Sequence, residues 1–136
     1  MRIMAVDYGD ARTGIAVSDK SATLAGDAWV INSRKAEDVA NAVVSEAAKR
    51  DIGLIIVGYP KNMDGTIGAR AEKCDTFADL LRSLCDIEVK LWDERMTTIS
   101  ANRILSEAGK FGKKRKKTID AVAASLILES YLGSLK

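Results

Sequence analysis

Acidic residues stand at three places in the sequence where an apolar segment begins or ends. Asp7 closes an apolar run near the N-terminus, Asp93 and Glu94 follow a strand-like segment, and Asp120 opens an apolar helix. A carboxylate at the end of a buried element is costly to desolvate unless a positive group meets it. Carboxylates without histidine bind hard cations such as Mg²⁺ or Mn²⁺. The pattern therefore predicts a divalent-metal site of oxygen ligands.

Taken singly, each of these positions also has a simpler explanation. Asp7 is a suitable residue for opening a turn, and Asp93 or Glu94 is placed to pair with Arg95. Asp120 would favour the start of a helix through the helix dipole. Together they fit a site that holds two ions roughly 3.5–4 Å apart, which can activate water and stabilise the leaving oxygen of a phosphodiester.

The chain of 136 residues has no histidine, which excludes Ser-His and Cys-His catalysis and imidazole metal ligands. Its net charge is only +2, but cations are concentrated in the basic segment, residues 110–117. Such a block is typical of a solvated charge run, and its place just before Asp120 favours binding to a polyanion. We expect phosphate contacts from this segment and from arginines elsewhere: Arg12, Arg70, Arg95, Lys113, Lys114, Arg115, Lys116 and Lys117.

Length and composition are those of one globular domain, expected to span residues 1–136. Cys74 and Cys85 lie on one predicted helix, roughly 16 Å apart along its axis, which is too far for a disulfide. No apolar run has membrane-spanning length, and no signal peptide is expected before the first strand. A reduced, cytoplasmic protein without membrane contact is the simplest interpretation.

Hydrophobic periodicity predicts five strands and four helices in the order β-β-β-α-β-α-β-α-α. Three strands joined by short turns, followed by strands that alternate with helices, predict a mixed five-stranded α/β sheet with helices on both faces. The first helix is expected to be capped by Ser33. The expected strands are 3–7, 13–18, 24–31, 52–57 and 87–92, and the expected helices are 36–48, 69–84, 97 or 98 to 109, and 119–132.

Open α/β sheets bind ligands at the carboxyl ends of their strands, where Asp7 and the Asp93-Glu94 pair both fall. If the first and fifth strands are parallel neighbours, their carboxylates converge. On the last helix Asp120 shares a face with Ala124 and Ile127, so it is expected to face the sheet.

Asp-x-Gly, here Asp7-Tyr8-Gly9, also occurs in ATPases, where a hairpin embraces the phosphates of ATP. Those proteins need two such domains to close around the nucleotide, and this chain has one. The glycine-bearing loop 58–68 has no Gly-Lys-Ser/Thr, so it is not a Walker motif.

Four ordered motifs span nearly the whole chain, and together they resemble the YqgF family, also called RuvX-like, of the ribonuclease H-like superfamily. They are Asp7-x-Gly9-x-x-Arg12-x-Gly14-x-Ala16-x-Ser18-Asp19, Gly58-x-Pro60 with Gly65 and Phe77-Ala78, Asp93-Glu94-Arg95-x-Thr97-Thr98, and Lys117-x-x-Asp120-x-x-Ala123-Ala124. The resemblance implies a metal-dependent nuclease associated with maturation of the 5′ end of pre-16S ribosomal RNA; the family was earlier described as Holliday junction resolvases.

The resemblance also implies which residues form the acidic site. Asp7, the Asp93-Glu94 pair and Asp120 match the site proposed for the family. Junction-resolving relatives carry an acid at the end of the fourth strand, whereas this strand ends in Val57-Gly58-Tyr59. We therefore expect the acid on the fifth strand to replace it, with Glu94 favoured as the ligand and Asp93 as the alternative.

Three functional hypotheses follow from these observations. The first is a nuclease that processes structured RNA, in contact with ribosome-associated factors. The second is a resolvase of branched DNA, which would be a symmetric dimer. The third is a non-catalytic RNA-binding factor in ribosome assembly. The sequence does not separate a monomer from a homodimer.

Overall fold

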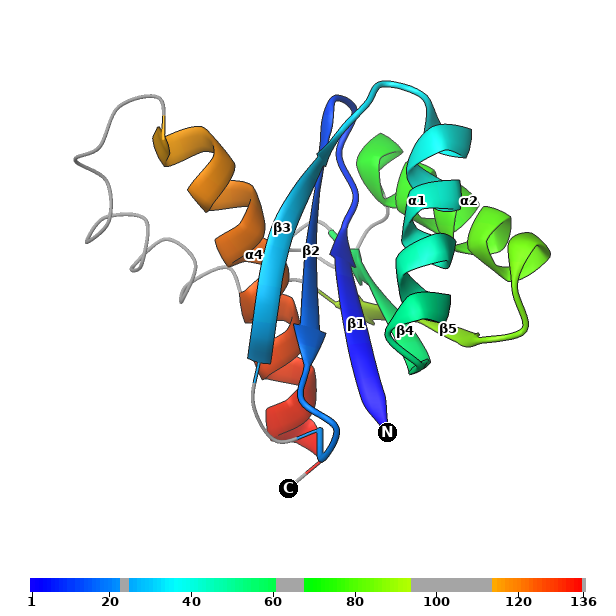
Figure 1. Ribbon diagram of the computed structural model, residues 1–136. Coiled ribbons are helices and arrows are strands. Elements are labelled where there is room, and N and C mark those ends of the chain that lie inside the picture. The colour runs from blue at the N-terminus through cyan, green and yellow to red at the C-terminus, as the bar shows by residue number, and fades with distance from the viewer. Residues whose placement is uncertain (23–24, 61–67, 94–113, 136) are drawn as a thin grey trace.

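Five strands form one mixed sheet in the order β3-β2-β1-β4-β5 (Figure 1). The computed structural model describes residues 1–22, 25–60, 68–93 and 114–135, with the side chains of residue 25 and of 114–120 left out. The first three strands form an antiparallel meander, and β4 and β5 run parallel to β1. This confirms the predicted ribonuclease H-like arrangement. The strands are β1 Arg2–Asp7, β2 Arg12–Ser18, β3 Ala25–Asn32, β4 Ile52–Tyr59 and β5 Glu88–Asp93.

Helices cover both faces of the sheet, as Figure 1 shows. On one face lie α1, Ala36–Lys49, and α2, Ala69–Leu84, which pack on each other and on β4 and β5. On the other face α4, Lys114–Ser134, crosses β1, β2 and β3. The first turns of α4 lie at the end of the sheet that holds the β1–β2 hairpin, and both termini of the chain lie at the opposite end.

Strand alternation decides on which face of the sheet each side chain of β1 lies. Met4 and Val6 belong to the core beneath α1 and α2, whereas Ile3 and Ala5 belong to the core beneath α4. All four are buried, because β1 is the central strand and its two faces are both covered. Side chains alternate along a strand, so Asp7 is on the same face as Ile3 and Ala5, the face covered by α4.

Several boundaries differ from those expected. The fourth strand extends to Tyr59, because Gly58 and Tyr59 still pair with Trp92 and Asp93 of β5. The last helix begins at Lys114 instead of residue 119, since lysine and arginine are good helix formers and nothing after Gly112 breaks the helix. The expected helix from 97 or 98 to 109 lies outside the described residues.

Two further expectations concern the first helix and the order of the strands. Lys35, and not Ser33, is the N-cap of α1; the Ser33 hydroxyl accepts the Lys35 N–H at 3.1 Å before the helix begins. The first and fifth strands are not neighbours, because β4 lies between them. Their ends are therefore two strand spacings apart, about 9.5 Å.

The cysteines agree with the sequence-based prediction, since neither Cys74 nor Cys85 forms a disulfide. Among the helices that the structure describes, none combines the length and the apolar character that crossing a bilayer requires.

Candidate functional site

Asp7 occupies the carboxyl end of the central strand, where it pairs with Gly14 of β2. Its side chain is only 14% exposed, and its Oδ1 lies 3.8 Å from the guanidinium of Arg70 on α2. The preceding four residues are buried in the sheet, so the carboxylate is held on a rigid element. A rigid, mostly covered oxygen donor at a strand end is a suitable first ligand for a hard cation.

The turn after Asp7 is tight, and Gly9 makes it possible. A Cβ on Gly9 would collide with the carbonyl oxygen of Arg12. The Gly9 N–H also points to the hydroxyl of the buried Thr13, at 3.4 Å. The Asp-x-Gly spacing thus has a structural reason here: the backbone of the hairpin folds back so closely on itself that no side chain fits.

Two cations from the first turns of α2 reach the acids of this hairpin. Arg70 approaches Asp7, and the Lys73 ammonium lies 3.1 Å from Asp10. Arg70 and Lys73 are 62% and 59% exposed, so water screens both pairs. Arg70, expected from the sequence to hold phosphate, is therefore found beside the first expected metal ligand.

The acid expected from the fifth strand is described only in part. Asp93 ends β5 and pairs in register with Tyr59. Trp92 belongs to the α4 side, where its ring N–H donates to the Ser130 hydroxyl at 3.1 Å and its ring meets Tyr131 edge-on. By alternation Asp93 falls on the α1–α2 side, opposite to Asp7. Glu94 lies outside the described residues.

The third expected ligand, Asp120, is in the second turn of α4. It lies one turn before Ala124, which is fully buried against the sheet. Ser130, the partner of Trp92, is ten residues further along α4, or about 15 Å along the helix axis. The contact between Trp92 of β5 and α4 thus lies well away from position 120.

The basic segment is partly helical. The first turn of α4 is formed by Lys114, Arg115, Lys116 and Lys117, which corrects the expectation that the last helix begins after them, at residue 119. Lys113 and Arg95 lie outside the described residues. Arg12 is exposed at the first position of β2, on the hairpin that Asp7 opens.

Within the part of the chain whose side chains are described, no three acidic, cysteine or histidine residues gather as a metal site. Of the expected site residues, the structure brings Asp7 and Arg70 together. It leaves Asp93 on another strand end, and the convergence of Asp7, Glu94 and Asp120 stays a prediction.

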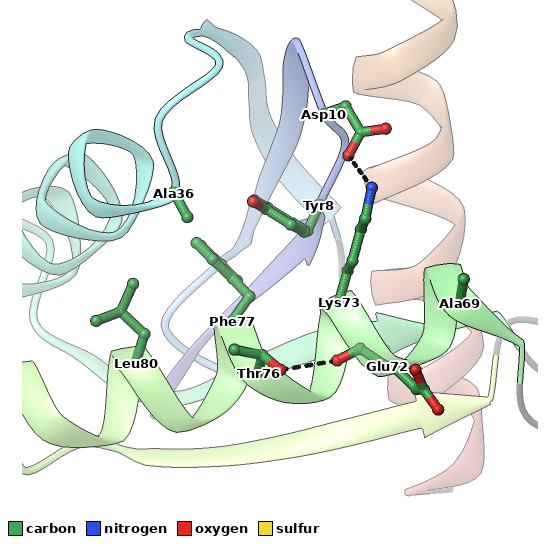
Figure 2. A pocket seen from close by; sticks show the side chains of 9 residues that line it. All are labelled: Tyr8, Asp10, Ala36, Ala69, Glu72, Lys73, Thr76, Phe77 and Leu80. Atoms are coloured by element: carbon green, nitrogen blue, oxygen red, sulfur yellow. Dashed lines mark hydrogen bonds and ion pairs between the residues drawn. The ribbon is translucent and has the colours of Figure 1, made fainter.

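A groove that the sequence did not reveal lies between the β1–β2 hairpin and α2, on the α1–α2 side of the sheet (Figure 2). It has a volume of about 490 Å³. Tyr8 stacks on Phe77 within it, with ring centroids 4.2 Å apart and planes 12° from parallel. Burial, followed by the charge of Asp10, raises the pKa of the Tyr8 phenol. An aromatic residue inside a turn motif was the available signal. The groove is lined by Tyr8, Asp10, Ala36, Ala69, Glu72, Lys73, Thr76, Phe77 and Leu80.

Comparison with known proteins gives relatives over nearly the full length. A family model described as "RuvX: Holliday junction resolvase" matches residues 1–134. A protein of Halothermothrix orenii named "Putative pre-16S rRNA nuclease" is 48% identical over 133 residues, which covers 98% of this chain and 95% of that protein. A protein of Acetivibrio thermocellus with the same name is 46% identical, covering 98% and 96%.

Solved structures with the same fold are more distant in sequence. The chain is similar to RuvC of T. thermophilus in complex with a Holliday junction substrate, with a TM-score of 0.65 and 11% identity; the match covers 100% of this chain and 97% of RuvC. It is also similar to the Fowlpox virus resolvase in complex with Holliday junction DNA, with a TM-score of 0.57, 13% identity and 99% coverage of both chains. At these identities the similarity shows the fold.

Proposed function

The chain belongs to the RuvX family of nucleases, and we propose that it is a metal-dependent phosphodiesterase that processes the 5′ end of pre-16S ribosomal RNA. The observation that carries the proposal is Asp7, a mostly covered carboxylate on the end of the central strand with a cation beside it. The names of the relatives at 46–48% identity support the substrate. We propose that residues 1–136 act as one ribonuclease H-like domain in the cytoplasm.

Asp7, Glu94 and Asp120 are the proposed ligands, and Mg²⁺ or Mn²⁺ the proposed ions, most simply two of them. Oxygen donors without histidine fit these hard cations. The ions would supply an activated water and a stabilised leaving oxygen. The chain itself holds the Asp7 carboxylate in place through β1 and presents the Arg70 guanidinium on the same side of the site, where it can bind a phosphate oxygen.

One observation favours Glu94 over Asp93 as the ligand. By strand alternation Asp93 falls on the face of the sheet opposite to Asp7, so its carboxylate is poorly placed to share an ion with the Asp7 carboxylate.

The first turn of α4 supports nucleic-acid binding. Four consecutive cations at the N-terminus of a helix oppose the helix dipole, at a cost of about 0.3–1 kcal/mol each at low salt. A phosphate backbone at this place would remove that cost, since its charge suits both the lysines and the N–H groups of the first helical turn, which have no partner within the helix. We therefore propose that Lys113 and this turn, with Arg12 and Arg95, bind the substrate backbone, with ribosome-associated factors as further partners.

A second candidate function is resolution of branched DNA. The description of the matching family favours it, and so does the fold shared with junction resolvases. It requires two active sites related by a two-fold axis, hence a homodimer. A non-catalytic role in ribosome assembly is the third candidate, and it predicts binding without cleavage.

The test is a cleavage assay of the purified protein on a pre-16S leader RNA and on a four-way DNA junction, each with Mg²⁺, Mn²⁺ or EDTA. We expect metal-dependent cleavage of the RNA and its loss in Asp7→Asn, which keeps the shape of the side chain and removes its charge. Asp79→Asn is the matched control, an exposed acid on α2 that pairs with Arg82. Cleavage of the junction alone would select the resolvase, and binding without cleavage the third candidate.

A further inference from the structure

The groove between the β1–β2 hairpin and α2 is built from three separate parts of the chain: the hairpin, the start of α1 and residues 69–80 of α2. Figure 2 shows Phe77 rising from α2 beneath Tyr8, with Ala36 and Leu80 near one end and the Asp10–Lys73 pair near the other. Its volume of about 490 Å³ falls in the range of small-molecule sites. The proposed cleavage chemistry gives this groove no role.

The aromatic pair makes a rigid surface for stacking. Phe77 is only 2% exposed, so Tyr8, which is half-buried, carries the accessible ring surface of the pair. Because Phe77 already fixes the Tyr8 ring, the Tyr8 side chain loses little conformational entropy when a ligand stacks on it. Nucleobases stack on aromatic side chains whatever their sequence, since every base has a π-face.

The charges of the groove favour an uncharged ligand. Asp10 and Lys73 neutralise each other at 3.1 Å, and Glu72 adds a second carboxylate. A phosphate would meet two carboxylates and one ammonium, and it would be repelled. A base brings no charge, and the rim offers it polar partners. The phenol hydroxyl of Tyr8 can donate a hydrogen bond to such a base.

The position of the groove ties it to the proposed site. Tyr8 directly follows Asp7, and alternation sends their side chains to opposite faces at the tip of β1. Because the two residues are adjacent in the chain, a strand that brought a phosphate to Asp7 would have a flanking nucleotide near the hairpin. A base inside a duplex is paired and stacked, and extruding it costs free energy, so an unpaired base turns into the groove most readily.

We propose that this groove receives one unpaired nucleobase next to the scissile phosphodiester, so that the substrate is an RNA with a bulged or single-stranded nucleotide at the cut. The proposal rests on the nuclease function above. It makes Tyr8 the stacking residue and Thr76 a wall of the groove.

The experiment compares two RNA duplexes that differ by one base. One carries a single bulged adenosine, and the other carries an abasic nucleotide at the same bulge. Their dissociation constants are measured by fluorescence anisotropy in EDTA, where no cleavage occurs. We expect wild-type protein to bind the adenosine bulge about tenfold more tightly, a factor within the range for one stacked base.

Two variants of α2 give the matched comparison. Thr76→Phe fills the groove; the Thr76 hydroxyl donates to the Glu72 carbonyl of its own helix, at 3.0 Å. Ser83→Phe places the same ring two turns further on, outside the groove, and the Ser83 hydroxyl likewise donates within the helix, to Leu80. The preference for the adenosine bulge should vanish in Thr76→Phe and persist in Ser83→Phe. Tyr8→Leu should also lose the preference for the adenosine bulge, and it replaces Thr76→Phe in the test if that variant does not fold.

Equal binding of the two duplexes by wild-type protein would overturn the proposal, as would a tenfold preference that survives in folded Thr76→Phe. Because the measurement needs no cleavage, it separates this proposal from the nuclease function. A base preference without turnover in Mg²⁺ would support the groove and contradict the nuclease. Turnover without a base preference would support the nuclease and contradict the groove.

Discussion

Replacement of Arg70 by glutamine should tighten metal binding while it weakens RNA binding. The Arg70 guanidinium lies 3.8 Å from the Asp7 carboxylate, the proposed ligand. Two unit charges at that separation interact by about 1 kcal/mol in water and about 4 kcal/mol at an effective dielectric constant of 20. Since Arg70 is 62% exposed, the lower figure applies. Removing this competing cation should therefore lower the dissociation constant for a divalent ion about fivefold.

The assay is calorimetric titration of Mn²⁺ into the free protein, so that RNA binding does not enter. Lys73→Gln is the matched control, because Lys73 lies one turn further along α2, has similar exposure and pairs with Asp10 instead of Asp7. Its effect on the Mn²⁺ dissociation constant should be smaller. RNA binding, measured separately in EDTA, should weaken in Arg70→Gln. The slope of log affinity against log salt concentration should become shallower by about 0.7–0.9 for each phosphate contact that is lost.

An unchanged or weaker Mn²⁺ affinity in Arg70→Gln, with the fold intact by urea denaturation, would refute this reasoning. It would mean that the cation does not bind at Asp7, or that Arg70 supports the site in some other way. Equal changes in Arg70→Gln and Lys73→Gln would show a general effect of net charge, and would also count against the specific pair.

Three further predictions test other parts of the structure. Glu94→Gln should reduce RNA cleavage far more than Asp93→Asn, because Asp93 falls on the face opposite to Asp7; a dead Asp93→Asn with an active Glu94→Gln would reverse the assignment. The basic segment is neutralised by changing Lys113, Lys114, Arg115 and Lys116 to glutamine. This variant should bind RNA of any sequence more weakly, with a weaker dependence of affinity on salt, while its turnover at saturating RNA should suffer less. Identical salt titrations of variant and wild type would show that the segment is a solvated charge run. Gly9→Ala should lower the free energy of unfolding in urea by about 1–3 kcal/mol through its collision with the Arg12 carbonyl, whereas Gly133→Ala, where a Cβ meets nothing, should not lower it.

The fold was largely predictable because its elements carry strong local signals. The continuous apolar run before Asp7 predicted a strand covered on both faces, and Met4 and Ala5 are indeed fully buried. The basic segment misled the prediction, since a run of lysines is compatible with both a loop and a helix. Lysine and arginine are good helix formers, but without apolar residues the run has no hydrophobic period that would have revealed the helix.

The geometry of the site was less predictable than its residue types. Spacing along the chain placed acids at strand ends, but it did not show that β4 separates β1 from β5. That order depends on which strands bury each other best, a property of the whole sheet. The proximity of Arg70 to Asp7 and the stacking of Tyr8 on Phe77 likewise arise from the packing of α2, which a helical pattern alone does not position.

The central place of β1 has a consequence for when activity begins during synthesis. β1 is made first, but its partner β4 starts at Ile52, and the helix that covers Ile3 and Ala5 is the last element described. A nascent chain that ends before Lys114 lacks Asp120 and leaves this apolar face open to water. Such a chain is expected to be inactive and prone to aggregate. If Asp120 is a ligand as proposed, cleavage of RNA should therefore start only after α4 has left the ribosome.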